Sequence, residues 1–355
     1  MFRWHILVPL AAAALLGAAI WLPLGALVGT ACAVMLVGSV IAAVHHAEVI
    51  AHRVGEPFGT LVLALAITAI ELALILSVML AGGAGKSTLA RDTIFATVMI
   101  ICNGVVGLCV LLGSLRHHVQ VFRIEGAAPA YGALVALATL VLVMPVFTTT
   151  RPGPLYSTSQ LTFVASSSLI LWCVFTFFQT VRHRDFFLPA TDPSNEEAHA
   201  TPPTASAAWS SFALLLVSLV AVVGLAKILS PGIEAAVAAS GAPHAVIGIV
   251  IALIVLLPET WAALRAALAN RLQTSMNLAL GSALASIGLT IPAVVLASVA
   301  LKIPLVLGVE PKDIVLLVLT FMVGTISLGT GRTNMMQGVV QLVIFAAFLF
   351  LALVP

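Results

Sequence analysis

Two glutamates stand inside long uncharged segments of the sequence. Glu71 lies at the centre of a run from residue 59 to residue 81 that is otherwise uncharged. Glu259 ends the apolar stretch ALIVLLPE at 252–259. A charged side chain at the centre of a bilayer costs about 2.5–3.5 kcal/mol. Protonation, a bound cation or contact with water each lowers that cost. Such a pair can hold protons or a hard cation but resists holding both, so competition for one site predicts exchange of the two.

Ordinary structural roles for these glutamates stay open. A buried ion pair or a hydrogen-bonded packing residue would also place a carboxylate in an apolar segment. No Lys, Arg or His occurs between residues 59 and 81, and the nearest base after Glu259 is Arg265. We therefore favour a site for a transported metal cation and protons at Glu71 and Glu259.

Further oxygen atoms for this site come from neighbouring polar residues. Thr68 precedes the first glutamate by three residues and shares its helix face. Pro258 removes a helical hydrogen bond and frees the carbonyl four residues earlier, although a simple kink would explain it equally. Asn103 and Ser282 lie in the polar segments that follow each glutamate, where small residues four apart also suit close helix packing. We expect Thr68, Asn103 and Ser282 to contribute to cation and proton binding.

The segment VHHAEVIAHRVGE at 44–56 carries a second concentration of chemically active side chains, which are His45, His46, Glu48, His52 and Glu56. The last three recur every four residues and share one helix face. A proton relay or vestibule (Glu56, His52, Glu48), a plain interfacial helix and a zinc site all fit. The zinc alternative would make the protein an intramembrane metalloenzyme using His45, His46, Glu48 and His52, although the HExxH motif is absent. A channel is a weaker reading, because no filter-like sequence is present.

The amino-acid composition predicts the kind of structure that must position these residues. Of the 355 residues, 61% are hydrophobic and 8% are charged, against about 25% charged in soluble domains. We therefore expect an all-α polytopic membrane protein with membrane lipid around it. The uncharged runs predict eleven transmembrane helices, near 4–22, 24–44, 59–81, 93–114, 130–147, 159–180, 209–229, 244–262, 277–301, 312–328 and 337–354. No basic patch suggests nucleic acid, no motif predicts a cofactor, and an oligomer is compatible with the sequence.

The two halves of the chain resemble each other. ALAITAIE at 64–71 and ALIVLLPE at 252–259 both fit A-L-x-[IV]-x-x-x-E, and five spans separate the equivalent positions. Because five is odd, the halves cross the membrane in opposite directions, as in many secondary transporters. We expect an additional N-terminal helix at 1–23, five-helix repeats at 24–181 and 209–355, and a hydrophilic cytoplasmic linker at 182–208.

The distribution of basic residues predicts the orientation. With a cytoplasmic N-terminus, nine arginines fall inside, and five basic residues fall outside, which are Lys86, Arg91, Arg151, Lys302 and Lys312. The inside set is Arg3, Arg53, Arg116, Arg123, Arg182, Arg184, Arg265, Arg271 and Arg332. This asymmetry favours a cytoplasmic N-terminus.

Residues 55–74 (GEPFGTLVLALAITAIELAL) and 258–292 (PETWAALRAALANRLQTSMNLALGSALASIGLTIP) resemble the two signature regions of the calcium/cation antiporter superfamily. They are most similar to the bacterial ChaA-type branch of the cation/proton exchangers. The resemblance implies exchange of Ca²⁺, Na⁺ or K⁺ for protons across the bacterial inner membrane, with Glu71 and Glu259 at the ion site and Glu56 at the cytoplasmic mouth. Most members have Gly-Asn-Ala-x-Glu at the two glutamates, and both asparagines are missing here, so the cation preference stays open.

Overall fold

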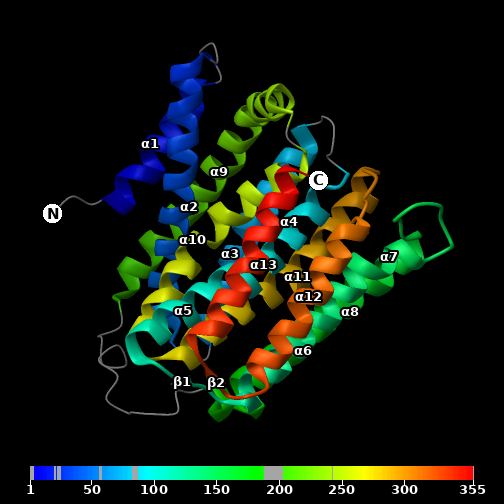
Figure 1. Cartoon of the computed structure of the whole chain (residues 1–355). Helices are drawn as coiled ribbons and strands as arrows, with labels where there is room; N and C mark the ends of the chain where they lie inside the picture. The colour runs from blue at the N-terminus through cyan, green and yellow to red at the C-terminus, as the bar shows by residue number, and fades with distance from the viewer. Residues whose placement is uncertain are drawn as a thin grey trace. The chain divides into compact units, whose positions relative to one another are not determined.

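The computed structural model describes residues 4–19, 21, 25–55, 58–81, 87–187, 203–241 and 243–354, and these are overwhelmingly helical (Figure 1). Ten of the described helices or helical rods are long and apolar enough to cross a membrane, and the apolar helix α1 (Trp4–Ala19) precedes them. The eleven predicted helices are thereby confirmed, and the strand pairing is limited to two residues on each side.

The chain forms two compact units, and each draws on both halves of the sequence. The first unit comprises residues 1–86 and 196–255, and the second comprises residues 87–195 and 256–355. The division falls inside α10 (Ala245–Leu268), between Val255 and Leu256. Hydropathy alone could not predict these units, because it carries no information on which helices pack together.

The first unit contains α1, α2 (Ala26–Val54), α3 (Phe58–Ala81), α9 (Ala205–Ser240) and the beginning of α10. Helix α2 packs against α1, α3 and α9. It continues ten residues beyond the predicted end at residue 44, because the polar segment that follows contains no helix breaker before Gly55, which has a positive φ of 78°. Ser77 of α3 donates a hydrogen bond of 2.8 Å to the carbonyl of Val223 in α9.

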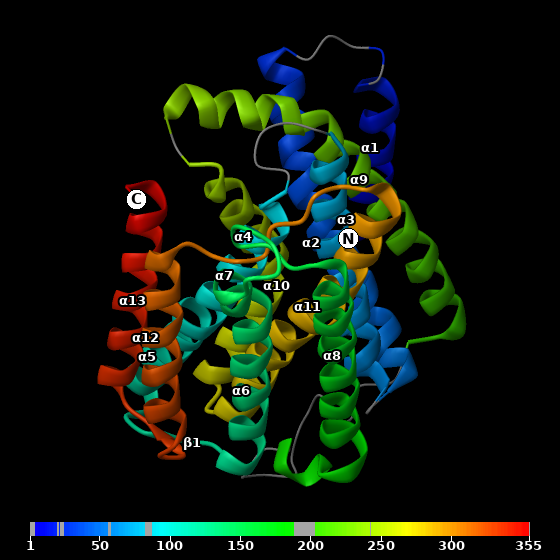
Figure 2. The ribbon, with the colours of Figure 1, turned by 90° about the vertical axis from the view of Figure 1, so that its right-hand side faces the viewer.

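The second unit contains the remaining helices. They are α4 (Leu89–Met99), η1 (Ile100–Val105), α5 (Val106–His117), α6 (Ile124–Ala138), η2 (Thr139–Val143), α7 (Met144–Phe147), α8 (Thr158–Phe177), η3 (Phe178–Arg182), η4 (Arg184–Phe187), the end of α10, α11 (Leu272–Leu301), α12 (Pro311–Leu328) and α13 (Met335–Leu353). Helix α11 packs against α4, α5, α6 and α8, and α13 packs against α5 and α12. Figure 2 shows α12 and α13 side by side. Segments η1, η2 and η3 are π-helical, which the sequence did not predict.

Hydrogen bonds fasten the connections at one end of the second unit. Strands β1 (Gln120–Val121) and β2 (Arg332–Thr333) pair antiparallel, which joins the α5–α6 and α12–α13 connections. Gln120 donates to the carbonyl of Ala267 at 2.8 Å, and the backbone N–H of Arg123 donates to Gln273 Oε1 at 2.6 Å. This end therefore carries Arg123, Arg271 and Arg332, which we expect on the cytoplasmic side.

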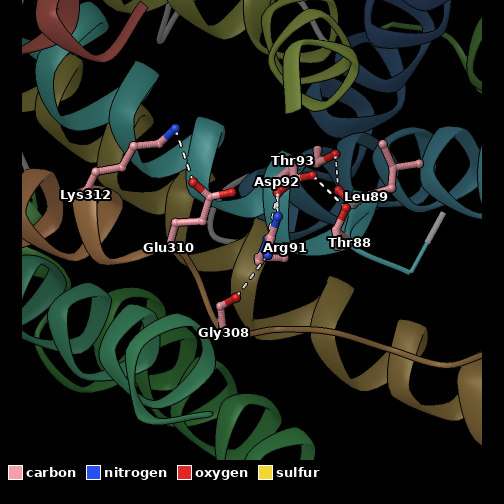
Figure 3. A network of polar contacts seen from close by, with 8 residues as sticks. All are labelled: Thr88, Leu89, Arg91, Asp92, Thr93, Gly308, Glu310 and Lys312. Atoms are coloured by element: carbon pink, nitrogen blue, oxygen red, sulfur yellow. Dashed lines mark hydrogen bonds and ion pairs between the residues drawn. The ribbon is translucent and has the colours of Figure 1, made fainter. Parts of the chain in front are cut away.

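The other end of the second unit is fastened around Arg91 and Asp92 at the start of α4 (Figure 3). Arg91 Nε and Nη2 both lie 2.7 Å from Asp92 Oδ1, and Arg91 Nη1 donates to the carbonyl of Gly308 at 3.1 Å. Thr88 donates to Asp92 Oδ2 at 2.9 Å. The pair thus connects the beginning of α4 to the segment between α11 and α12.

Candidate cation-binding site

Glu71 and Thr68 lie one turn apart in α3, in the first unit. Their exposed fractions are 3% and 5%, so neither side chain forms part of the lipid-facing surface. The sequence of α3 has no basic residue between Phe58 and Ala81. Apolar residues form the rest of this stretch of helix, and burial there removes water from the carboxylate. Protonation or a bound cation would lower the cost of burying this carboxylate.

Glu259 lies in α10 directly after Pro258, in the second unit. The helix continues through the proline, and Glu259 is 9% exposed. Ser282 of α11 donates a hydrogen bond of 3.3 Å from Oγ to Glu259 Oε1. The structure therefore brings together two of the residues that we predicted for the site, a carboxylate and a hydroxyl from neighbouring spans.

Helix α11 is packed unevenly along its length. A Cβ built on Gly281 would meet no atom within 4 Å, whereas one on Gly288, two turns later, would lie 2.5 Å from Trp172 Cβ. The helix is therefore tightly packed beyond the serine and loosely packed just before it.

Asn103 lies in the π-helical segment η1 and is 1% exposed. Its Nδ2 atom donates to Thr320 Oγ1 at 2.9 Å and lies 3.8 Å from Met99 Sδ. Segment η1 packs against α11, the helix that carries Ser282. The contact of Thr320 with Asn103 was not predicted from the sequence, because the hydroxyl of a single threonine in an apolar helix usually bonds to the backbone of its own helix. Isolated π turns are frequent at functional sites, and this one carries a predicted ligand.

The histidine-rich segment of α2 divides into two faces. His46 is buried, with Nδ1 3.2 Å from Ser211 Oγ and Nε2 2.9 Å from the carbonyl of His5. The ring of His45 lies 5.0 Å from that of His5. Glu48 and His52 are exposed, and Glu56 falls outside the described residues.

A metal site in this segment is not supported. Within the described ranges of the chain, no three His, Cys, Asp or Glu side chains are grouped so that they could hold a metal ion. The cluster of His45, His46, Glu48 and His52 that the alternative metalloenzyme reading required is split, because the first two histidines contact α1 and α9 while the other two residues are exposed.

Comparison with known proteins agrees with a transporter. The family model described as "Sodium/calcium exchanger protein" matches residues 21–181 and 210–354. The chain is 50% identical over 322 residues to the putative ionic transporter y4hA of Sinorhizobium fredii, which covers 90% of this chain and 87% of that protein. It is 36% identical over 317 residues to the sodium-potassium/proton antiporter ChaA of Escherichia coli, covering 88% and 85%.

A solved structure shares the fold. The structure of native YfkE superposes with a TM-score of 0.75 at 17% identity, covering 99% of this chain and 100% of that one. Together with the family match over both halves, these similarities show that the chain belongs to the sodium/calcium exchanger protein family and is a multi-pass membrane cation antiporter, not an enzyme.

Proposed function

We propose that this antiporter exchanges Na⁺, K⁺ or Ca²⁺ for protons, and that Glu71 and Glu259 carry both ions in turn. The observation that carries the proposal is the burial of two glutamates in membrane-spanning helices, with a hydroxyl donor on Glu259. The relative ChaA is named as a sodium-potassium/proton antiporter, which supports protons as the counter-ion. A crystal structure of YfkE is described as that of a Ca²⁺/H⁺ antiporter, which keeps Ca²⁺ among the candidates.

The ligand set favours Na⁺ and K⁺ over Ca²⁺. Calcium takes about six to eight oxygen ligands in proteins. In this chain, Thr68 and Leu256 stand at the positions where the family that it resembles carries asparagine, so two amide oxygens are missing. Thr68, Asn103 and Ser282 offer fewer oxygens in their place, which suits a monovalent cation.

Coupling follows from the charge of the empty site. The pair is neutral with two protons, with one divalent cation, or with one monovalent cation and one proton, so the repeats can reorient around these forms. The empty form would carry two charges through a dry intermediate, which the low-dielectric environment opposes. We propose that only the occupied forms alternate between the two sides, in an inner membrane with the N-terminus in the cytoplasm. Glu48, His52 and Glu56 would line the cytoplasmic entrance and relay protons.

The test is a proton-gradient assay in everted membrane vesicles, with Na⁺, K⁺ and Ca²⁺ added separately at several pH values. We expect dequenching of a pH-sensitive dye with at least one cation. Glu71→Gln and Glu259→Gln should each abolish it, because neither amide can exchange a proton for a cation. Glu125→Gln, which changes an exposed glutamate at the start of α6, is the matched control and should retain exchange.

Equal amounts of each variant in the membrane are required for the comparison. Undiminished exchange in Glu71→Gln and Glu259→Gln would reject the assignment of the site. Exchange that is absent from the parent protein with all three cations would reject the proposed ions.

A further inference from the structure

Asn103, Thr320 and Met99 form a closed polar group within the second unit. Asn103 Nδ2 lies 2.9 Å from Thr320 Oγ1 and 3.8 Å from Met99 Sδ, and Thr320 Oγ1 lies 3.5 Å from the same sulfur. Asn103 and Thr320 are each 1% exposed, and Met99 is fully buried. The Asn103 NH₂ group, the Thr320 hydroxyl and the Met99 sulfur, from two spans, therefore contact one another away from water.

The sulfur determines which way the amide of Asn103 points. A threonine hydroxyl can donate or accept, so Thr320 alone would tolerate either orientation of the amide. A thioether can only accept, so the atom of Asn103 that faces Met99 must be the NH₂ group. The hydroxyl hydrogen of Thr320 is also directed to the sulfur, which leaves its oxygen to accept from the amide. The NH₂ end is thus held, and the carbonyl oxygen is the end left for a ligand.

The surrounding helices hold this group in place. Tyr131 of α6 donates a hydrogen bond of 3.0 Å to the backbone carbonyl of Thr320. A Cβ on Gly324, one turn later in α12, would lie 1.9 Å from the hydroxyl oxygen of Tyr131, so the glycine makes room for that contact. On the other side, a Cβ on Gly104 would lie 3.3 Å from the ring of Phe345. The backbone is therefore closely packed beside both Thr320 and Asn103.

We propose that Thr320 and Met99 are positioning residues that orient the Asn103 amide with its carbonyl oxygen toward the transported cation. Hard cations bind oxygen and are repelled by an NH₂ group, so an amide free to turn would be a weaker ligand. This inference rests on the proposed function, because it assumes that Asn103 is part of the cation site. It assigns Thr320 a role although its own oxygen is already occupied by the amide.

The experiment compares Thr320→Val with Thr320→Ser in the vesicle assay, measuring the cation concentration that gives half-maximal exchange. Valine has nearly the shape of threonine but neither donates nor accepts. We expect it to raise that concentration about fivefold, equivalent to about 1 kcal/mol, the usual size of one hydrogen bond. Serine keeps the hydroxyl and should stay within about twofold of the parent. Met99→Leu should weaken binding in the same direction, because it removes the group that distinguishes NH₂ from oxygen.

A double variant separates positioning from packing. If Thr320 acts only through the amide, Thr320→Val should add no further loss to Asn103→Ala. Tyr131→Phe removes the hydrogen bond to the backbone of the same threonine and leaves the amide pair intact. It should lower thermal stability and raise the half-maximal cation concentration less than Thr320→Val does.

Two results would overturn the inference. One is parental cation affinity in Thr320→Val, and the other is losses in Thr320→Val and Asn103→Ala that multiply in the double variant. Should Thr320→Val fail to accumulate, the Thr320→Ser and Met99→Leu pair decides, since equal affinities in these two would contradict an orienting role for the sulfur. If Glu259→Gln abolishes exchange while Asn103→Ala binds cations normally, this inference fails and the proposed function stands.

Discussion

Replacing Arg91 by methionine should destabilise the protein far more than replacing Lys312, although both cations belong to the polar network in Figure 3. The side chains of Arg91 and Asp92 are 14% and 8% exposed, and three of the Arg91 nitrogens contact Asp92 or Gly308. Lys312 and Glu310 are 32% and 58% exposed, with 3.2 Å between their charged atoms. The two pairs therefore differ mainly in burial.

The expected magnitudes follow from that difference. Removing one partner of a buried ion pair costs about 3–5 kcal/mol, because the remaining charge stays buried. An exposed pair contributes about 0–1 kcal/mol. With about 2 °C lost for each kcal/mol in a large domain, Arg91→Met should lower the melting temperature by about 6 °C or more, and Lys312→Met by less than about 2 °C.

The assay is thermal unfolding of purified protein in one detergent, followed by intrinsic tryptophan fluorescence or by loss of monodisperse protein. The double variant Arg91→Met with Asp92→Asn provides the internal control, because it removes both charges. We expect it to recover part of the stability lost in Arg91→Met, since no uncompensated charge remains. Equal melting temperatures for Arg91→Met and Lys312→Met would refute the reasoning, as would a double variant that is less stable than both single variants.

Two further predictions concern close packing and a buried phenol in the second unit. Gly338→Ala should lower the melting temperature and the yield of folded protein, because the new Cβ would lie 2.6 Å from the backbone nitrogen of Leu111. Gly132→Ala would meet nothing within 4 Å and should be neutral or stabilising by up to about 1 kcal/mol. Equal losses of melting temperature in the two variants would contradict this prediction. Burial raises the pKa of Tyr156 to about 12, and its hydroxyl donates to the carbonyl of Leu140 at 2.6 Å. Between about pH 10 and pH 12 the unfolded chain releases this proton and the folded chain keeps it, so stability should fall as the pH rises through that window, and Tyr156→Phe should remove that part of the slope in pH-dependent melting.

Much of the fold could be predicted because lipid imposes a simple rule on the sequence. Each long uncharged run became a helix, since a span must satisfy its backbone internally. The ends were less accurate. Helix α9 begins at Ala205 and runs for 36 residues, against an expected 209–229, because the small and polar residues at both ends do not stop a helix. Hydropathy marks the membrane boundary and not the point at which helical hydrogen bonding ceases.

The candidate site was predictable in part. The glutamates stood out because charge is rare in such segments, and Ser282 proved to donate to Glu259. The partners of Asn103 were not predictable, because they depend on which helices pack together. Thr320 lies more than 200 residues away in the chain, and nothing in the sequence indicated more than apolar packing for Met99. The two compact units were also not predictable, since each combines helices from both halves of the chain.

The π turn at η1 lies between α4 and α5 in one continuous helical segment, so a change of length there alters how α5 faces its neighbours. An α-helix places 3.6 residues in each turn, so one inserted residue rotates everything beyond it by about 100°. The side chains of α5 are therefore rotated about the helix axis relative to where a regular α-helix continuing from α4 would place them. Deleting a single residue within Ile100–Val105 would restore a regular helix and turn Gly107, which approaches Gln341 and Leu342 of α13, away from its partner. In a lineage of such transporters, the insertion or deletion of one residue at this point would change the packing of α5 against α13 more than most substitutions.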